Sequence, residues 1–278
     1  MKIHTIDTGF FKLDGGAMFG VVPKVMWQKI NPADENNLCT WAMRCLLIEI
    51  DDRLILIDTG LGDKQSEKFF SYFHPHGEDS LMKSIEAKGF NADDITDVIH
   101  THLHFDHCGG SINRVDDELV PAFKNATYWH NETHWNWAMK PNDREKASFL
   151  KENFEPLQIQ GKVKFINPNN SPFKNITFEI VNGHTEAMLL PIINYNGKTF
   201  AYMADLIPSV GHIPLPYIMG YDLRALTTLN EKTSFLKKAY DNNYTLIFEH
   251  DPKIECCTLK MTEKGIRMDE AFKLNETV

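Results

Sequence analysis

The stretch His100-Thr-His-Leu-His-Phe-Asp-His-Cys-Gly-Gly110 places three imidazoles and one carboxylate within six positions, at His102, His104, Asp106 and His107. His102 and His104 are two positions apart, so in an extended segment their side chains point to the same side. Imidazole and carboxylate groups bind borderline cations such as zinc, and this spacing offers about two ligands to each of two ions. A polar loop with buried, hydrogen-bonded histidines is the alternative, but the pattern is specific enough to predict a metal site.

Further ligands are offered by three later stretches, each at the end of a predicted strand. These are Gly183-His184-Thr185 after a strand over 176–181, Asp205 after a strand over 199–204, and His250 after a strand over 244–249. A single histidine or aspartate after a strand is more often a turn or cap residue. Three such positions downstream of one histidine-rich loop together indicate a shared site. Asp58, which ends a predicted strand over 53–58, either orients a ligand imidazole or is a plain turn residue.

The order of these motifs resembles the metallo-β-lactamase superfamily, and the resemblance covers nearly the whole chain. The motifs are Asp58-Thr-Gly60, His102-x-His-x-Asp-His107, Gly183-His184-Thr185, Asp205 and His250. The resemblance implies an α+β fold, a four-layer αβ/βα sandwich, and two zinc ions per chain. It assigns the first metal to His102, His104 and His184, the second to Asp106, His107 and His250, and the bridging position to Asp205.

Within the superfamily, the chain resembles the branch of N-acyl-homoserine lactonases and methyl-parathion-hydrolase-like enzymes. The stretches that carry this resemblance are Asp14–Gly20 with Trp27, Asn142–Ala147, and Asp205–Ile213. The branch implies opening of an acyl lactone by a metal-bridging hydroxide, with Asp106 and Asp205 as catalytic residues. Such chemistry would make the chain a quorum-quenching hydrolase with a small-molecule substrate.

One departure from the branch affects the expected substrate contact. Known lactonases of the group carry a tyrosine shortly after the bridging aspartate, whereas Leu206-Ile-Pro208 follows Asp205 in this chain. His212, Tyr217, Tyr221 or water is then expected to contact the substrate oxygen. Candidates for the pocket wall are the apolar or aromatic residues Met18, Phe19, Phe69 and Trp135, together with His212.

Two other functions stay open. The first is hydrolysis of aryl esters or organophosphate triesters, because the same pair of metals can activate water for attack on phosphorus. The second belongs to another class, a non-catalytic or redox protein with two metal ions. Relative rates on a lactone and a phosphotriester distinguish the first alternative from a lactonase. The colour of the purified protein distinguishes the second, because ferric iron is coloured and zinc is not.

Composition and charge limit the classes of partner that the protein is expected to bind. The chain of 278 residues has a formal net charge of −9, which argues against nucleic acid or an anionic membrane as the main partner. No apolar run approaches the length of about 20 residues that a membrane helix needs. Five cysteines without paired spacing are interpreted as reduced thiols, so we expect a cytoplasmic protein. The oligomeric state stays open, with a homodimer as one alternative.

The order of predicted elements favours a single domain over residues 1–278. Strands in two runs, each followed by helices, predict two sheets packed face to face with helices outside. A helical insert is expected around residues 126–156, where tryptophans and histidines interrupt this order. We also expect a strand over 19–23, a helix over 222–241, and a strand over 256–261 that closes the chain.

Overall fold

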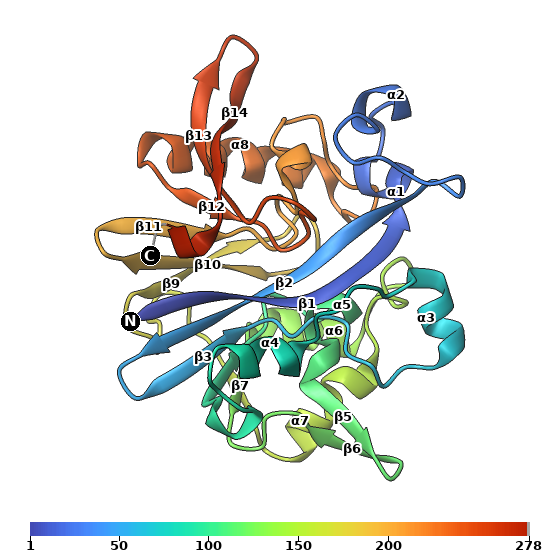
Figure 1. Ribbon diagram of the computed structural model, residues 1–278, viewed down its shortest axis with the longest axis vertical. Coiled ribbons are helices and arrows are strands. Elements are labelled where there is room, and N and C mark those ends of the chain that lie inside the picture. Colours follow the sequence, from blue (N-terminus) through green and yellow to red (C-terminus); the bar gives the residue numbers. More distant parts are fainter. Residues whose placement is uncertain (277–278) are drawn as a thin grey trace.

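Two six-stranded sheets with helices on their outer faces form four layers in the computed structural model (Figure 1). The structure describes residues 1–276. One sheet has the strand order β1-β2-β3-β4-β7-β8, and the other has the order β14-β13-β12-β11-β10-β9. Helix α8 lies outside the second sheet, while α4, α5 and α6 lie outside the first. The predicted four-layer αβ/βα sandwich is confirmed.

The first sheet begins antiparallel and continues parallel. Its strands are β1 (Lys2–Asp14), β2 (Leu38–Ile50), β3 (Arg53–Ile57), β4 (Asp97–Ile99), β7 (Thr127–His130) and β8 (Val163–Phe165). Strands β1, β2 and β3 pair antiparallel, whereas β4 pairs parallel with both β3 and β7. The carboxyl ends of β3 and β4 therefore meet at one edge, and the histidine-rich loop leaves the sheet there.

The second sheet repeats this arrangement with a central parallel pair. Its strands are β9 (Ile176–Val181), β10 (Met188–Tyr195), β11 (Lys198–Tyr202), β12 (Thr245–Ile247), β13 (Cys256–Thr262) and β14 (Gly265–Phe272). Strands β11 and β12 are parallel, so the chain leaves both at the same edge. The prediction that a strand over 256–261 closes the chain is wrong, because β14 pairs with β13 as a hairpin. No residue of β14 is fully buried, because this strand lies at the edge of the second sheet.

Short helices occupy the connections, and one long helix covers the second sheet. The helices are α1 (Gly15–Phe19), α2 (Lys24–Trp27), α3 (Glu67–Phe73), α4 (Leu81–Ala87), α5 (Phe105–Cys108), α6 (Glu132–Met139), α7 (Glu155–Ile159) and α8 (Ala225–Asp241). Shorter 3-10 turns are η1 (Ala92–Asp94), η2 (Gly109–Ser111), η3 (Lys151–Asn153), η4 (Val210–His212) and η5 (Leu274–Glu276), and β5 (Ile112–Val115) pairs with β6 (Glu118–Pro121). Within residues 1–276, no helix has the length and apolarity needed to cross a membrane.

Three predicted elements differ from the observed ones. The strand expected over 19–23 is replaced by the end of α1, which the Asp14 side chain caps by accepting a hydrogen bond from Ala17 N at 2.7 Å. The segment 126–156 is not helical throughout, because its first part is β7, a strand of the first sheet. Helix α8 begins at Ala225 rather than at Asp222, whose carboxylate is engaged by a histidine described below.

The two sheets share one hydrophobic core. Leu46 and Ile57 from the first sheet pack with Leu190, Tyr202 and Leu246 from the second, and all five side chains are completely buried. Burial of such side chains stabilises the fold by about 1.5–3 kcal/mol each. Packing of the sheets face to face brings the loops that follow β4, β9, β11 and β12 to one end of the sandwich.

Candidate metal centre

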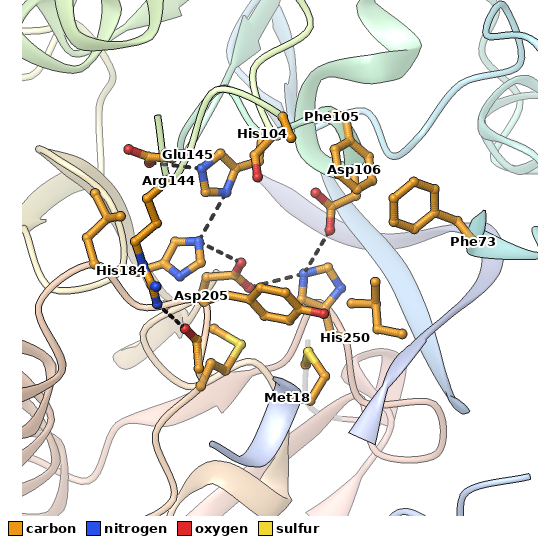
Figure 2. A pocket seen from close by; sticks show the side chains of 17 residues that line it. Met18, Phe73, His104, Phe105, Asp106, Arg144, Glu145, His184, Asp205 and His250 are labelled. Atoms are coloured by element: carbon orange, nitrogen blue, oxygen red, sulfur yellow. Dashed lines mark hydrogen bonds and ion pairs between the residues drawn. The ribbon is translucent and has the colours of Figure 1, made fainter. Parts of the chain in front are cut away.

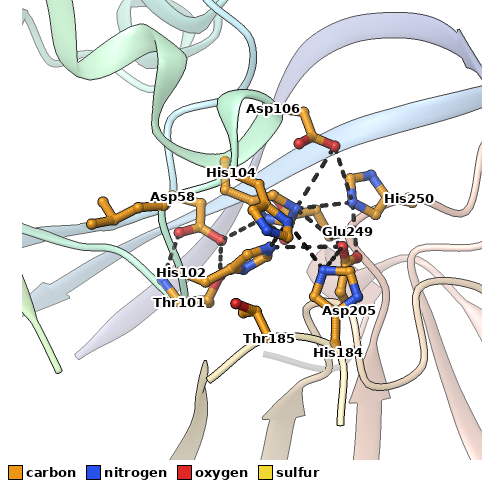
Figure 3. A network of polar contacts seen from close by, with 12 residues as sticks. Asp58, Thr101, His102, His104, Asp106, His184, Thr185, Asp205, Glu249 and His250 are labelled. Carbon is orange, nitrogen blue, oxygen red and sulfur yellow. Dashed lines mark hydrogen bonds and ion pairs between the residues drawn. The ribbon is translucent and has the colours of Figure 1, made fainter. Parts of the chain in front are cut away.

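Seven predicted ligand side chains meet at this end of the sandwich (Figure 3). His102 and His104 follow β4, and Asp106 and His107 lie in α5. The remaining three, His184, Asp205 and His250, come from the loops after β9, β11 and β12. Each of the seven residues is at most 8% exposed, although all are polar or charged. Buried groups of this kind need partners, because their transfer from water is costly.

The first group has the spacing of ligands around one ion. His104 Nδ1 lies 3.1 Å from both His102 Nε2 and His184 Nε2, and Asp205 Oδ2 lies 3.1 Å from His184 Nε2. All four ligand atoms lie within 4.8 Å of one another. Neighbouring ligands of a tetrahedral zinc ion, at bond lengths of about 2.0–2.1 Å, are separated by about 3.3 Å. The first group therefore fits a tetrahedral divalent ion.

The second group lies directly beside the first. His107 Nε2 and His250 Nε2 are 3.3 Å apart, and Asp106 Oδ2 lies 3.8 Å and 3.9 Å from them. Asp205 faces this group as well, since its Oδ1 is 3.1 Å from His250 Nε2 and its Oδ2 is 3.5 Å from His107 Nε2. The two oxygens of Asp205 thus point at both groups, which is the geometry of a bridging carboxylate.

The electrostatics of the cluster favour cations in these two positions. Asp205 Oδ1 is buried without a hydrogen-bond partner. Although burial lowers the pKa of His184 and His250, the carboxylate of Asp205 raises these pKa values to about 10 and about 9. The carboxylate therefore requires positive charge at the positions of these imidazoles. A divalent ion bound to neutral imidazoles meets the same requirement, so the donor set fits one ion in each group.

The second ring nitrogen of every histidine ligand has a partner that fixes the ring. The contacts are His102 Nδ1 to Thr101 Oγ1 at 3.0 Å, His104 Nε2 to Glu145 Oε1 at 3.1 Å, His107 Nδ1 to Asp58 Oδ2 at 3.2 Å, His184 Nδ1 to Asp222 Oδ1 at 2.9 Å and His250 Nδ1 to Ala42 O at 2.8 Å. Contacts of this kind hold the tautomer and orientation of a ligand imidazole. The five rings are thus aimed at the centre before any ion binds.

Asp58 lies among these partners. Its carboxylate accepts hydrogen bonds from Thr101 N at 2.8 Å and from Thr101 Oγ1 at 2.7 Å, besides contacting His107. The backbone of Asp58 has a positive φ of 58°, which directs the chain into the turn with Gly60. These contacts support the role of Asp58 in orienting a ligand imidazole. The residue also lies in a turn, as the other alternative predicted.

Glu249 is a second carboxylate against the same imidazole. Its Oε2 lies 3.1 Å from His107 Nδ1, and the residue is completely buried. Neither carboxylate oxygen has a hydrogen bond, and burial raises the pKa of Glu249 to about 7. Sequence reasoning treated this position only as the end of a strand. The available signal was an acidic residue at the end of a strand and directly before the ligand His250.

Glu145 and Asp222 were also missed as partners of ligand histidines. Glu145 accepts hydrogen bonds from Trp137 Nε1 at 2.7 Å and from Thr185 Oγ1, in addition to its contact with His104. Burial opposes ionisation, but the His104 contact and these hydrogen bonds lower the pKa of Glu145 to about 2. Asp222 was interpreted as the start of a helix. Neither residue stands beside a ligand in the sequence, so no local pattern reveals its role.

A cavity of about 380 Å³ opens onto the candidate metal ligands (Figure 2). Its floor contains His104, Asp106, His184, Asp205 and His250. The other lining residues are Leu13, Met18, Phe73, Phe105, Arg144, Glu145, Ala147, Ser148, Met219, Gly220, Tyr221 and Leu223. A polar floor is thus joined to a largely apolar wall, an arrangement typical of small-molecule sites.

The lining differs from the predicted pocket residues, of which Met18 alone is present. Phe19 is completely buried and stacks on Trp27 and His212, and Trp135 packs in the core outside the first sheet. Phe69 lies behind the wall, in ring contact with Phe73 and Phe105. The prediction therefore found the right aromatic cluster at Phe69 but chose the residue one helical turn away from the cavity.

His212 is also turned away from the cavity. Its Nε2 donates to Met18 O at 2.8 Å, and its Nδ1 lies 2.8 Å from Ser209 Oγ. Both ring nitrogens are thereby occupied inside the protein. Of the residues considered for contact with the substrate oxygen, Tyr221 lines the cavity, whereas His212 and Tyr217 do not.

Comparisons with known proteins agree with this fold. Residues 44–250 match the family model of the metallo-beta-lactamase superfamily. N-acyl homoserine lactonase AiiA of Bacillus thuringiensis subsp. kurstaki is 26% identical over 230 residues, covering 77% of this chain and 82% of the relative. The chain belongs to the metallo-β-lactamase superfamily, as the resemblance of its motifs predicted.

Two solved structures are similar over almost their full length. A probable metal-dependent hydrolase from Staphylococcus aureus superposes with a TM-score of 0.89 at 26% identity, covering 98% of this chain and 96% of that chain. The dizinc quorum-quenching lactonase AidC, solved with a product, superposes with a TM-score of 0.80 at 22% identity, covering 98% and 95%. The second likeness concerns the fold alone.

Proposed function

We propose that the protein is a dizinc hydrolase that opens the lactone ring of N-acyl-homoserine lactones. The observation that carries this proposal is the position of Asp205. Its carboxylate oxygens lie 3.1 Å from His184 Nε2 of one ligand group and 3.1 Å from His250 Nε2 of the other, on the floor of an apolar-walled cavity. The curated relatives, including the AiiA lactonase at 26% identity, support the substrate class.

The ligand groups suit this chemistry. When bound, two divalent ions would lower the pKa of water and polarise a carbonyl. His102, His104 and His184 would hold the first ion, while Asp106, His107 and His250 would hold the second. Asp205 would hold both, because its Oδ2 lies beside His184 of the first group and its Oδ1 beside His250 of the second. Imidazole and carboxylate ligands in this number are typical of zinc.

The reacting groups of the protein itself are carboxylates. Asp106 lines the cavity with its Oδ2 3.8 Å from His107 Nε2, so it can orient an attacking water and pass a proton to the departing oxygen. No serine or cysteine nucleophile is required for this route. Cys108, the cysteine beside the ligands, is completely buried and burial raises its thiol pKa to about 12, which makes it a poor nucleophile.

The apolar wall suits an acyl tail. Met18, Phe73 and Phe105 line the cavity, and Figure 2 shows both phenylalanines on the side of Asp106 away from His184. A tail laid on this wall would gain about 0.8 kcal/mol per buried methylene. The substrate would then span the cavity, with its ester at the metal ligands and its tail on the aromatic rings.

The test is a substrate panel on protein whose metal content has been measured. We expect kcat/KM for N-acyl-homoserine lactones to exceed the values for aryl esters and for a phosphotriester by at least about 10-fold, a difference of 1.4 kcal/mol in transition-state stabilisation. Faster turnover of the phosphotriester or of a simple aryl ester would replace the lactonase proposal by the alternative hydrolase. Redox-active iron without hydrolysis of any ester would exclude both.

A further inference from the structure

Arg144 is the single lysine or arginine among the described residues that line the cavity. Three carboxylates, those of Asp106, Glu145 and Asp205, line the same cavity. The catalytic chemistry proposed above assigns no task to the guanidinium group. A guanidinium at the wall of such a cavity can donate hydrogen bonds to a ligand bound there.

The backbone at Arg144 is tied rigidly to the metal ligands. Its N–H donates to Asn142 Oδ1 at 2.9 Å, which closes a tight turn. The next residue, Glu145, is buried and contacts His104 Nε2 at 3.1 Å. The hydrogen bond to Asn142 and the contact of Glu145 with His104 therefore fix the position of the Arg144 backbone relative to His104.

The side chain crosses the cavity wall beside His184 (Figure 2). One terminal nitrogen, Nη2, donates to the carbonyl of Gly220, which also lines the cavity. Within residues 1–276, Arg144 has no ion pair with a carboxylate, whereas its neighbour Lys146 pairs with Asp143 at 2.8 Å. Arginine has five N–H donors, so most of this fork is available to a ligand.

We propose that Arg144 is a specificity-determining residue that binds a second carbonyl oxygen of the substrate, the amide oxygen of an N-acyl group. This inference rests on the proposed lactonase function. The ester carbonyl would face the metal ligands, which leaves the amide oxygen to find a donor elsewhere. The side-chain donors of the remaining lining are Arg144, Ser148 and Tyr221, and a guanidinium gives the strongest hydrogen bond of the three. An unpaired amide oxygen in the same cavity would oppose binding.

The experiment compares two lactones of equal carbon number, N-octanoyl-homoserine lactone and γ-dodecalactone, which lacks the amide. Arg144→Gln in zinc-reconstituted protein should lower kcat/KM for the first by about 10-fold to 100-fold, mainly through KM. The second should change by no more than about 2-fold, since it offers no amide oxygen. Arg144→Lys keeps the charge without the fork and should retain part of the preference. Lys146→Gln, on the same turn but outside the cavity lining, is the matched control and should change neither rate.

A second readout does not depend on hydrolysis. N-Cyclopentyloctanamide has the amide but no ester, and its dissociation constant should rise by about 10-fold or more in Arg144→Gln. Equal loss on both lactones would show that Arg144 only holds the Gly220 segment, and unchanged binding of the amide would equally overturn the inference. If the unmodified protein opens neither lactone, the proposed function fails, and the amide binding comparison still decides the role of Arg144.

Discussion

The Nε2 atom of His104 lies 3.1 Å from Oε1 of Glu145, so a residue 41 positions further along the chain holds a predicted metal ligand in place. Both residues are buried, and Glu145 is held in turn by Trp137 and Thr185. The contact fixes the ring so that Nδ1 points at His102 and His184. The segment after β7 thus forms part of the metal site, although none of its own residues belongs to either ligand group.

Glu145→Gln should weaken zinc binding by about 10-fold to 100-fold, because the amide cannot polarise the His104 ring as a carboxylate does. The affinity is measured by competition with a chromophoric chelator. Glu152→Gln is the control, since Glu152 pairs with Arg114 on the exposed surface. Partners of ligand histidines usually change metal affinity by more than about 2-fold. A zinc affinity of Glu145→Gln within about 2-fold of the unmodified protein would therefore show that Glu145 does not support the site.

Asp205→Asn should bind one zinc ion firmly and the second poorly, because an amide cannot bridge two cations as a carboxylate does. The loss of lactone hydrolysis should exceed about 100-fold, since partners that only orient ligands already contribute about 10-fold to 100-fold. Zinc content after gel filtration and the hydrolysis rate are measured on the same sample. Near-normal turnover with two ions bound would show that Asp205 does not bridge.

Asp58 Oδ2 and Glu249 Oε2 lie 3.2 Å and 3.1 Å from the same ring nitrogen, Nδ1 of His107. Each of Asp58→Asn and Glu249→Gln should therefore weaken binding of the second ion by about 10-fold or less, since the remaining carboxylate can still accept a hydrogen bond from the His107 ring. The double variant should lose more than the product of the two factors. Cobalt absorption spectra follow the second site during titration. Independent, multiplicative effects would mean that the two carboxylates do not substitute for each other.

The dependence of kcat/KM on acyl chain length tests whether the tail binds to the apolar wall of the cavity. If the tail lies on Phe73 and Phe105, kcat/KM should rise by up to about 4-fold per methylene until the cavity is filled. Phe73→Ala should flatten this dependence, while Tyr72→Ala, at a residue 60% exposed on the same helix, should preserve it. Rates that stay constant from butanoyl to dodecanoyl substrates would place the tail outside the cavity.

The fold and the ligand set follow from local patterns in the sequence. Buried runs such as Ile176–Val181 identify strands by composition, and β9 has these same bounds. The predicted ligands follow such strands directly, so once the strands are found, parallel pairing brings their carboxyl ends together. This pairing brings Asp205 and His250 to one edge of the second sheet, whereas His102 follows β4 of the first sheet and is joined to them by the resemblance of the motif order.

The cavity could not be predicted in the same way. Arg144, Tyr221 and Phe73 reach it from connections whose course depends on contacts between distant segments, such as the hydrogen bond from Gly220 N to Ala17 O. Hydrophobicity marks Phe69 and Phe73 equally, and only the orientation of α3 decides that Phe73 faces the cavity. Pattern analysis also does not find the carboxylates of Glu145 and Asp222, because nothing nearby in the sequence identifies their histidine partners.

Titration of metal-free protein with zinc tests most directly whether two ions act together on a lactone. Hydrolysis of N-octanoyl-homoserine lactone is followed as zinc is added in tenths of an equivalent. We expect little activity up to one equivalent per chain and a steep rise that ends at two, because the seven ligands form two groups joined by Asp205. Full activity at one equivalent or without zinc, or no lactone hydrolysis at two equivalents, would contradict the account.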